Sequence, residues 1–379
     1  MAHPGASPTA AFAGPSASKQ RVAVALSGGV DSSTAAVLLI QHGYQVVGVT
    51  MRLWAVPDAD PLRVSCSSFP DAVDDARRVC ALLGIPFHVV DLEAEFKARV
   101  VGYFCDSYAL GRTPNPCLVC NPEIKFGALL RIVREWGVDY LATGHYARIR
   151  SQDGQYQLLR AADRHKDQSY VLYALGQEEL PRLLFPLGDH NKRQVRAMAA
   201  ALGLPTAGKA ESQDACFLSH GDYRAFLARE RPETVRPGPI LDLQGRVLGK
   251  HGGVAFYTVG QRQGLGLPAP HPLYVVEIDP ARNALVVGPK AALFRSELLA
   301  EDVHFVAGYP PPQPISITAK IRYKAPEAAA TLVPLPEEKA RVLFAAPQPA
   351  ITPGQGVVFY QDDIVIGGGI ITSTISAED

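Results

Sequence analysis

Three of the six cysteines stand in segments whose residue types could support thiol chemistry. Cys117 and Cys120 form a C-x-x-C pair in a proline-rich loop, just before a helix that we expect to begin near Pro122. A thiol at a helix N-terminus has a lowered pKa and therefore a larger thiolate fraction. Cys216 lies among polar residues and turn formers, although taken alone it could also be a small buried hydrophobe. These thiols are the candidates for nucleophilic or redox chemistry.

The other three cysteines, Cys66, Cys80 and Cys105, have apolar or helix-like neighbours, and we expect them to be packing residues. Residues 1–20 are rich in Ala, Pro, Ser and Gly, and they lack the charged start and the apolar run of a signal peptide. They also contain no Arg, which argues against a mitochondrial transit peptide. We therefore expect a disordered tail, a cytoplasmic protein and reduced thiols.

A second candidate site is the segment 26–33 (LSGGVDSS), between a predicted strand and a predicted helix. Gly28 and Gly29 allow the backbone to approach an anion, and the helix N-terminus offers unpaired N–H groups and a positive dipole end. The spacing is not that of a Walker loop, whose lysine is also missing. A loop of hydroxyls and amides suits the pyrophosphate part of ATP, and Asp31 would then need Mg²⁺ between itself and the phosphates. The alternative is an ordinary serine-capped helix after a glycine turn.

The first half of the chain alternates short apolar strands with helical patterns, which is typical of an α/β fold with a parallel sheet covered by helices on both faces. Because the first strand opens directly into the glycine-rich turn, its site is expected at the carboxyl edge of the sheet. The predicted strands lie at 21–26, 45–51, 87–92 and 139–144, and the predicted helices at 32–42, 71–83 and 123–136.

After about Tyr223 glycine and proline become frequent and the apolar runs shorten, which is typical of an all-β region. Strands are predicted at 254–259, 273–278, 284–287, 315–321, 357–360 and 364–371. We expect a disordered tail at 1–20, an ATP-binding catalytic domain at 21–226, a small central β domain at 227–295 and a C-terminal β-barrel at 296–379.

Length and composition exclude several classes of protein. A chain of 379 residues is too long for one ordinary domain, and 47% hydrophobic with 20% charged residues suits globular cores. Lys+Arg and Asp+Glu are equal at 37 each, so an RNA-binding surface would have to be a local patch. No stretch approaches the roughly 20 apolar residues that a membrane span needs, and no membrane association is expected.

The motif S-G-G-V-D-S after a strand resembles that of the PP-loop ATP pyrophosphatases, which cleave ATP between its α- and β-phosphates and adenylate their substrates. Further segments closely resemble the tRNA-specific 2-thiouridylases, over nearly the whole chain from Arg21. They are GRTPNPCLVCNPEIK at 111–125, TGHYAR at 143–148, KDQSYVL at 166–172, ESQDACFL at 211–218, YTVGQRQGLG at 257–266, KIRY at 320–323 and PGQ at 353–355. So many matches in one order are far more specific than any single motif.

The resemblance implies a PP-loop domain, a small central domain and a C-terminal β-barrel, and an enzyme that uses ATP to thiolate the wobble uridine of the Lys, Glu and Gln tRNAs. ATP would be bound by Ala25, Leu26, Ser27, Gly28, Gly29, Val30, Asp31, Ser32, Met51 and Gly144. The tRNA and its target base would be contacted by Asn115, Pro116, Cys117, His145, Lys166, Asp167, Gln168, Arg322, Tyr323 and Gln355.

In the implied reaction Cys216 carries a persulfide and Cys120 is the nucleophile that resolves the intermediate. Adenylation turns the uridine C2 oxygen into AMP, a good leaving group, and the persulfide sulfur attacks C2. Cys120 then releases the thiocarbonyl and leaves a Cys120–Cys216 disulfide for an external reductant. The sulfur would come from a cysteine desulfurase or a sulfur-relay protein.

Cys117 departs from the family pattern, because many members have Asp, a natural general base, at this position. Cys117, Cys120 and Cys216 could hold a [4Fe–4S] cluster with one open iron, or act as a redox pair plus a carrier. Without the resemblance, His145 fits a satisfied loop histidine, and Lys166, Asp167, Arg322 and Tyr323 fit ordinary turn and strand-end residues.

Two rival functions remain. A PP-loop enzyme that amidates a small molecule would need neither a persulfide nor a barrel with basic and aromatic loops. A non-catalytic RNA-binding protein with a relic nucleotide site is disfavoured by the intact loop motif.

Overall fold

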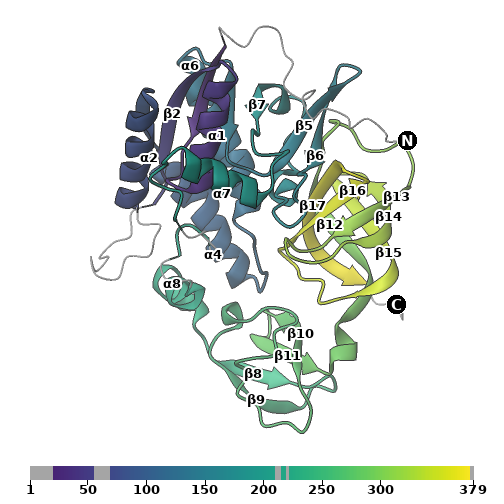
Figure 1. The fold of residues 1–379 in the computed structure, drawn as a ribbon. Coiled ribbons are helices and arrows are strands. Elements are labelled where there is room, and N and C mark those ends of the chain that lie inside the picture. Colours follow the sequence, from purple (N-terminus) through teal and green to yellow (C-terminus); the bar gives the residue numbers. More distant parts are fainter. Residues whose placement is uncertain (1–19, 55–68, 210–214, 219–221, 376–379) are drawn as a thin grey trace, which may run out of the picture.

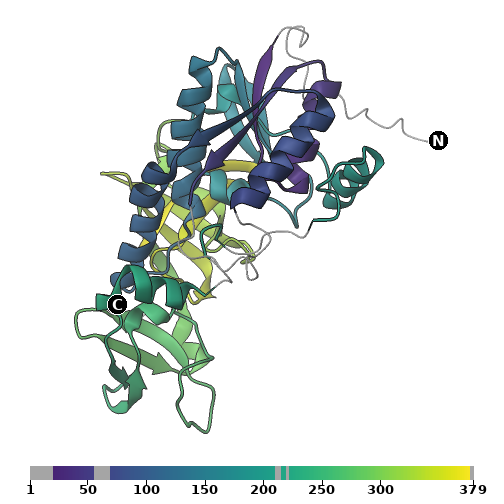
Figure 2. The ribbon, with the colours of Figure 1, turned by 90° about the vertical axis from the view of Figure 1, so that its left-hand side faces the viewer.

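The computed structural model describes residues 20–54, 69–209, 215–218 and 222–375. Figure 1 shows an α/β body at the upper left, a barrel at the right and a small β body at the bottom, and Figure 2 shows the same arrangement from the side. This architecture confirms the predicted fold class. The tail expected at 1–20, apart from Gln20, and Cys66 lie outside the described residues.

A five-stranded parallel sheet organises the N-terminal part, in the order β3-β2-β1-β4-β7. The four strands predicted there are confirmed as β1 to β4. Because β1 has β2 on one side and β4 on the other, the loops after β1 and β4 meet at a switch point of the carboxyl edge. The strands are β1 (Arg21–Ala25), β2 (Gln45–Arg52), β3 (Phe87–Asp91), β4 (Tyr140–Thr143) and β7 (Leu183–Leu184).

Helices cover both faces of this sheet, as predicted. Val22 and Val24 of β1 pack with α1 (Val30–Gln41) and α2 (Phe69–Leu83), whereas Ala23 belongs to the core on the other face, because successive strand residues point to opposite sides. The helices on that other face are α3 (Glu93–Phe96), η2 (Lys97–Val101), α4 (Gly102–Ala109), α5 (Cys117–Val119), η3 (Cys120–Leu129) and α6 (Leu130–Glu135). Cys80 and Cys105 are both buried, which confirms them as packing residues.

One helix begins earlier than predicted. The sequence predicts a helix at 123–136 that begins near Pro122, but the helical run already begins at Cys117, so Cys117 and Cys120 lie in its first turn. Helix η3 has π-type hydrogen bonding, which accommodates a proline without an N–H. A Cβ at Gly127 would lie 2.7 Å from the Pro122 carbonyl oxygen, so this register favours glycine there.

Helix α7 (Lys192–Ala201) packs against α1 and was not predicted. Its Asn191 cap accepts a hydrogen bond from the Gln194 backbone N–H, and the Gln194 side chain accepts one from the Asn191 backbone in return. Val195 and Ala199 are fully buried in clusters with α1 residues. The first residue of α7, Lys192, is therefore held close to the start of α1.

The small β body contains β8 (Gly238–Leu241), β9 (Val247–His251), β10 (Tyr274–Asp279) and β11 (Ala284–Gly288), in the order β10-β11-β8-β9. It follows α8 (Tyr223–Glu230) and the turn η7 (Pro232–Thr234). The strands predicted at 273–278 and 284–287 are confirmed as β10 and β11. The strand predicted at 254–259 is wrong, because Val254 and Ala255 are buried in the single turn η8 (Val254–Phe256). A short apolar run does not distinguish the two structures.

The C-terminal strands form a closed six-stranded barrel, because the first pairs with the last. The strands predicted at 315–321, 357–360 and 364–371 are confirmed, whereas β12, β14 and β15 were not predicted. The barrel strands are β12 (Phe294–Phe305), β13 (Ile315–Lys320), β14 (Ala328–Leu335), β15 (Lys339–Pro349), β16 (Gly356–Gln361) and β17 (Ile364–Ile375).

A hairpin from the α/β part extends the barrel sheet. Its strands β5 (Ala147–Gln152) and β6 (Gln155–Arg160) turn at Asp153 and Gly154, both with positive φ, and Leu159 pairs with Ile364 of β17. The Asp-Gly dipeptide was the signal that could have revealed this hairpin from the sequence. The two bodies are therefore joined by backbone pairing.

Candidate active site

The glycine-rich loop between β1 and α1 closes on itself through its own hydroxyls. The Ser27 N–H donates to Ser32 Oγ at 3.1 Å, and the Ser27 and Ser32 hydroxyls lie 3.2 Å apart. Thr50 of β2 anchors the start of the loop by donating to the Leu26 carbonyl at 2.9 Å. No side chain caps α1 at Gly29, so the first N–H groups of the helix have no side-chain acceptor there.

Two glycines allow the loop its close approaches. Gly28 has a φ of +69°, and a Cβ there would lie 2.7 Å from the Ala72 carbonyl oxygen. Gly144 follows β4, and its Cβ would lie 2.6 Å from the Ser32 backbone nitrogen. Met51 lies near the end of β2, which pairs with β1, the strand that leads into the glycine-rich loop. The residues expected to bind the nucleotide therefore gather at the carboxyl edge of β1, β2 and β4.

Asp31 has partners that the sequence did not reveal. Both of its carboxylate oxygens accept from Lys192 Nζ at 2.7 Å, and the Tyr146 hydroxyl donates to Oδ1 at 2.8 Å. A second lysine, Lys209, donates to the Gly28 carbonyl oxygen at 3.2 Å and pairs with Asp75. Tyr146 and Lys192 are distant in sequence from the loop, so only the folded chain brings them to it.

The three candidate thiols differ in exposure. Cys117 and Cys216 are exposed, and Cys120 is buried; all the described cysteines have free thiols. Burial raises the pKa of Cys120 to about 11, which Lys125 partly opposes. The lowered pKa expected for a thiol at a helix start is therefore wrong for Cys120, because desolvation outweighs the helix end.

The Cys216 side chain is exposed to solvent. Desolvation, followed by the nearby thiols of Cys120 and Cys117, raises the pKa of Cys216 to about 12. For transfer chemistry the exposure is the decisive property, because a donor must reach the sulfur. The next residue, Phe217, is buried against Phe104 at 5.1 Å between ring centroids and holds this segment in place.

The loop before Cys117 is held by all three parts of the chain. Asn115 Oδ1 accepts the Cys117 N–H at 3.1 Å, which fixes the start of the helix. Gln355 of the barrel donates to the Thr113 carbonyl at 2.8 Å, and Thr258 of the small β body accepts from the Thr113 hydroxyl at 3.1 Å. The position of Asn115, Pro116 and Cys117 therefore depends on how the bodies dock.

Arg322 and Tyr323 lie in the turn after β13, and both side chains are half-buried and packed there. Arg322 donates to the Ala350 carbonyl at 3.1 Å and also bonds the Thr352 hydroxyl. The Tyr323 ring lies 5.8 Å from that of Tyr170. Arg322 thus holds the barrel loop at Ala350 and Thr352, and Gln355 of the same loop bonds Thr113, in addition to any role in binding tRNA.

His145 is buried, and its Nδ1 lies 2.7 Å from the Thr143 hydroxyl. Burial and then the Lys125 charge hold its pKa well below the usual value. Asp167 is also buried and accepts from Ser169 Oγ at 2.7 Å, and Gln168 accepts the Tyr146 N–H at 2.9 Å. These contacts fit the alternative interpretation of His145 as a satisfied loop histidine, whereas the buried Asp167 does not lie in a solvated turn; Lys166 beside it is half-buried.

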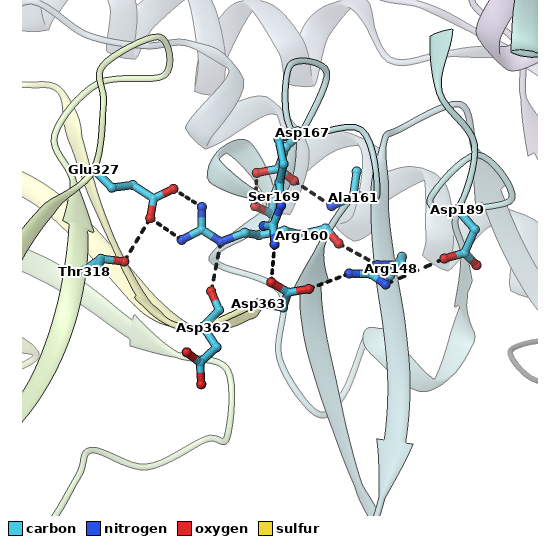
Figure 3. Close-up of polar contacts among 11 residues, drawn as sticks. Arg148, Arg160, Ala161, Asp167, Ser169, Asp189, Thr318, Glu327, Asp362 and Asp363 are labelled. Atoms are coloured by element: carbon cyan, nitrogen blue, oxygen red, sulfur yellow. Dashed lines mark hydrogen bonds and ion pairs between the residues drawn. The ribbon is translucent and has the colours of Figure 1, made fainter. Parts of the chain in front are cut away.

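An ion-pair network fastens the hairpin to the barrel (Figure 3). Arg160 of β6 pairs with Glu327 through a 2.7 Å contact and lies 3.6 Å above the Tyr360 ring. Arg148 of β5 pairs with Asp363 at 2.9 Å. Because Tyr146 immediately precedes β5, this network also fixes the tyrosine that contacts Asp31.

The described residues show no preformed metal site. No group of three or more His, Cys, Asp or Glu side chains in the described ranges could hold a metal ion. Cys117, Cys120 and Cys216 therefore do not form a ready cluster site in this arrangement. Asp31, the carboxylate expected to order Mg²⁺, is already neutralised by Lys192.

A parallel sheet with a glycine-rich loop at its switch point, followed by two β bodies, defines a nucleotide-binding α/β protein of the HUP-domain class. Family models match it in three consecutive pieces: the tRNA methyl transferase HUP domain at 20–220, the tRNA methyl transferase PRC-barrel domain at 224–289 and the aminomethyltransferase β-barrel domain at 295–371. The chain belongs to the tRNA-specific 2-thiouridylase family.

Two relatives establish this membership. A tRNA-specific 2-thiouridylase of Roseiflexus castenholzii is 51% identical over 367 residues, which cover 93% of this chain and 99% of the relative. Another, of Moorella thermoacetica, is 53% identical over 353 residues, which cover 92% of this chain and 99% of the relative.

Within the described ranges, no helix combines the length and apolar character needed to cross a membrane.

Proposed function

We propose that this chain converts a uridine of tRNA into 2-thiouridine, by adenylating its C2 oxygen with ATP and transferring sulfur from a persulfide on Cys216. The observation that carries the proposal is that one α/β body contains both the glycine-rich loop and an exposed thiol, Cys216. Cys120 is close enough to Cys216 to raise the pKa of that thiol. The substrate is the wobble uridine of the Lys, Glu and Gln tRNAs in the cytoplasm. The α/β, central and barrel parts are assigned to 21–226, 227–295 and 296–379.

The proposed chemistry balances in three steps. The C2 oxygen attacks the α-phosphate of ATP and releases pyrophosphate. The terminal sulfur of the Cys216 persulfide then attacks C2, and the C2–O bond breaks to release AMP. Finally the Cys120 thiolate attacks the Cys216 Sγ, the S–S bond to the transferred sulfur breaks, and 2-thiouridine leaves behind a Cys120–Cys216 disulfide. An external dithiol reduces that disulfide, and a desulfurase or sulfur-relay protein reloads Cys216.

The different exposures of the thiols suit these roles. The exposed Cys216 can be loaded by a separate donor protein, whereas the buried Cys120 is shielded from it. The raised pKa of Cys120 keeps it protonated before the substrate arrives, which limits premature reaction with the persulfide. Asn115, Pro116 and Cys117 lie just before Cys120 in sequence and are proposed to face the target base.

The proposed reaction includes Mg²⁺ as a companion of ATP but assigns no role to an iron–sulfur cluster. Mg²⁺ would enter bound to ATP, and Asp31, the carboxylate expected to order it, is paired with Lys192. The three thiols do not form a metal-holding group in the described structure, so no step is assigned to a cluster.

Two other reactions are disfavoured by the thiols. Amidation of a small molecule would use the phosphate loop but neither Cys120 nor Cys216. Methylation, which the description of two matching family models as tRNA methyl transferase suggests, would use neither the loop nor the thiol pair.

The test is to incubate the purified protein with ATP, cysteine, a cysteine desulfurase, a dithiol reductant and unmodified tRNA. We expect AMP and pyrophosphate to form only when tRNA is present, and digestion of the tRNA to yield 2-thiouridine. AMP formation that needs a small-molecule acid and ammonia instead of tRNA would support amidation and refute the proposal.

A further inference from the structure

The acidic residue of the glycine-rich loop is paired with a cation from another helix. Asp31 is the only acidic residue in the segment 26–33, and Lys192 Nζ lies 2.7 Å from each of its carboxylate oxygens. The lysine side chain is only 12% exposed. The loop motif itself contains no lysine, in contrast to a Walker loop. The fold thus supplies a cation that the motif lacks.

Lys192 is held in this position by the helix that it begins. The capping box of Asn191 and Gln194 fixes the first turn of α7, and Val195 packs fully buried against α1. The Lys192 backbone N–H also donates to Asp163 Oδ2 at 3.0 Å. The ammonium group is therefore directed to the start of α1 by a rigid backbone.

Stability alone does not explain why a lysine occupies the first position of α7. A cation in the first turn of a helix is opposed by the positive end of the helix dipole. A largely buried ion pair also recovers little beyond the cost of desolvating both charges. Local preferences that are violated in this way are typical of functional positions.

A second contact allows the lysine to change partners. The Tyr146 hydroxyl donates to Asp31 Oδ1 at 2.8 Å, so the carboxylate keeps a donor when the ammonium turns away. The flexible lysine stem can redirect its three donors, whereas Asp31 is fixed in the first turn of α1.

We infer that Lys192 supplies to the β- and γ-phosphates of ATP the positive charge that the loop lacks, and that Asp31 positions Lys192 for this task. This rests on the proposed use of ATP and assigns a binding residue outside the loop motif. It also changes the role expected for Asp31, from holding Mg²⁺ to holding Lys192.

The test compares two nucleotides that share adenosine and the α-phosphate. Binding of α,β-methylene-ATP with Mg²⁺, and of AMP, is measured by calorimetry for the wild type and for Lys192→Gln. Glutamine can still hydrogen bond to Asp31 but carries no charge. We expect the affinity for the ATP analogue to fall at least about tenfold and that for AMP less than about twofold, since only the former loses a charged phosphate contact.

Further variants separate a structural effect from a loss of charge. Lys192→Arg should recover most of the affinity, and Lys339→Ala, which removes a lysine paired with Glu301 in the barrel, should change neither affinity. Circular dichroism and thermal melting verify folding. Equal losses for both nucleotides, or no loss for either, would overturn the inference while leaving ATP use intact; a wild type that binds neither nucleotide would instead overturn the proposed function.

Discussion

The side-chain amide of Gln355 donates a 2.8 Å hydrogen bond to the carbonyl oxygen of Thr113. Gln355 lies in the barrel loop before β16, and Thr113 precedes the segment that carries Asn115 and Cys117. The Thr113 N–H also donates to the Pro353 carbonyl at 2.8 Å. The barrel therefore takes part in positioning the thiol-bearing loop of another body.

Gln355→Ala should slow thiolation by about three- to tenfold, because one hydrogen bond that positions the Cys117 loop is lost. The effect should lie in kcat, with the KM for tRNA changed by less than about twofold. Steady-state 2-thiouridine formation at several tRNA concentrations measures both quantities.

Gln348→Ala is the matched control, because that glutamine also donates to a carbonyl at 2.8 Å, but within its own strand. It should leave both constants unchanged. A Gln355→Ala protein with normal kcat and a strongly raised KM would show that Gln355 acts on tRNA directly rather than on the loop.

Arg160→Ala should lower the free energy of unfolding by about 2–3 kcal/mol, because loss of the largely buried guanidinium removes the ion-pair partner of Glu327 and uncovers the Tyr360 ring. Urea denaturation followed by circular dichroism measures the change. Arg246→Ala, which breaks a pair with Asp242 in which the arginine side chain is exposed, should leave the urea midpoint nearly unchanged. Equal midpoints for the two variants would contradict the importance of the hairpin–barrel network.

Local periodicity accounts for what the sequence predicted well. Strands β1 to β4 and helices α1 and α2 have regular apolar spacing, and the glycine-rich loop has an explicit motif. The pairing of Asp31 with Lys192 has no such signal, because only tertiary packing brings α7 to the loop. The box formed by Asn191 and Gln194 could have revealed α7 and placed Lys192 at its start.

Residue type alone does not predict exposure. The contacts of His145 and Arg322 with tRNA that the resemblance implies stay a prediction; in the structure His145 is buried and Arg322 holds the barrel loop. Cys120 lies in the first helical turn as a reactive thiol should, but burial dominates its pKa. Burial depends on which segments pack above a residue, and the local sequence does not contain that information.

Alkylation of Cys216 should depend steeply on pH. Its pKa is raised to about 12, so the thiolate fraction should rise about tenfold per pH unit between pH 7 and 9. Iodoacetamide labelling followed by peptide mass spectrometry measures the rate, and the buried Cys80 and Cys105 should remain unlabelled in the folded protein. A Cys216 rate that levels off below pH 9 would contradict the raised pKa.

Mass spectrometry of digested tRNA, with pyrophosphate release measured in the same reaction, tests the central claim most directly. Cys216→Ser should still adenylate tRNA and release pyrophosphate from ATP but form no 2-thiouridine, because activation needs the phosphate loop and transfer needs the persulfide. Cys120→Ser should also form none, while Cys80→Ser and Cys105→Ser should retain activity. Full 2-thiouridine formation by the Cys216→Ser protein would contradict the account.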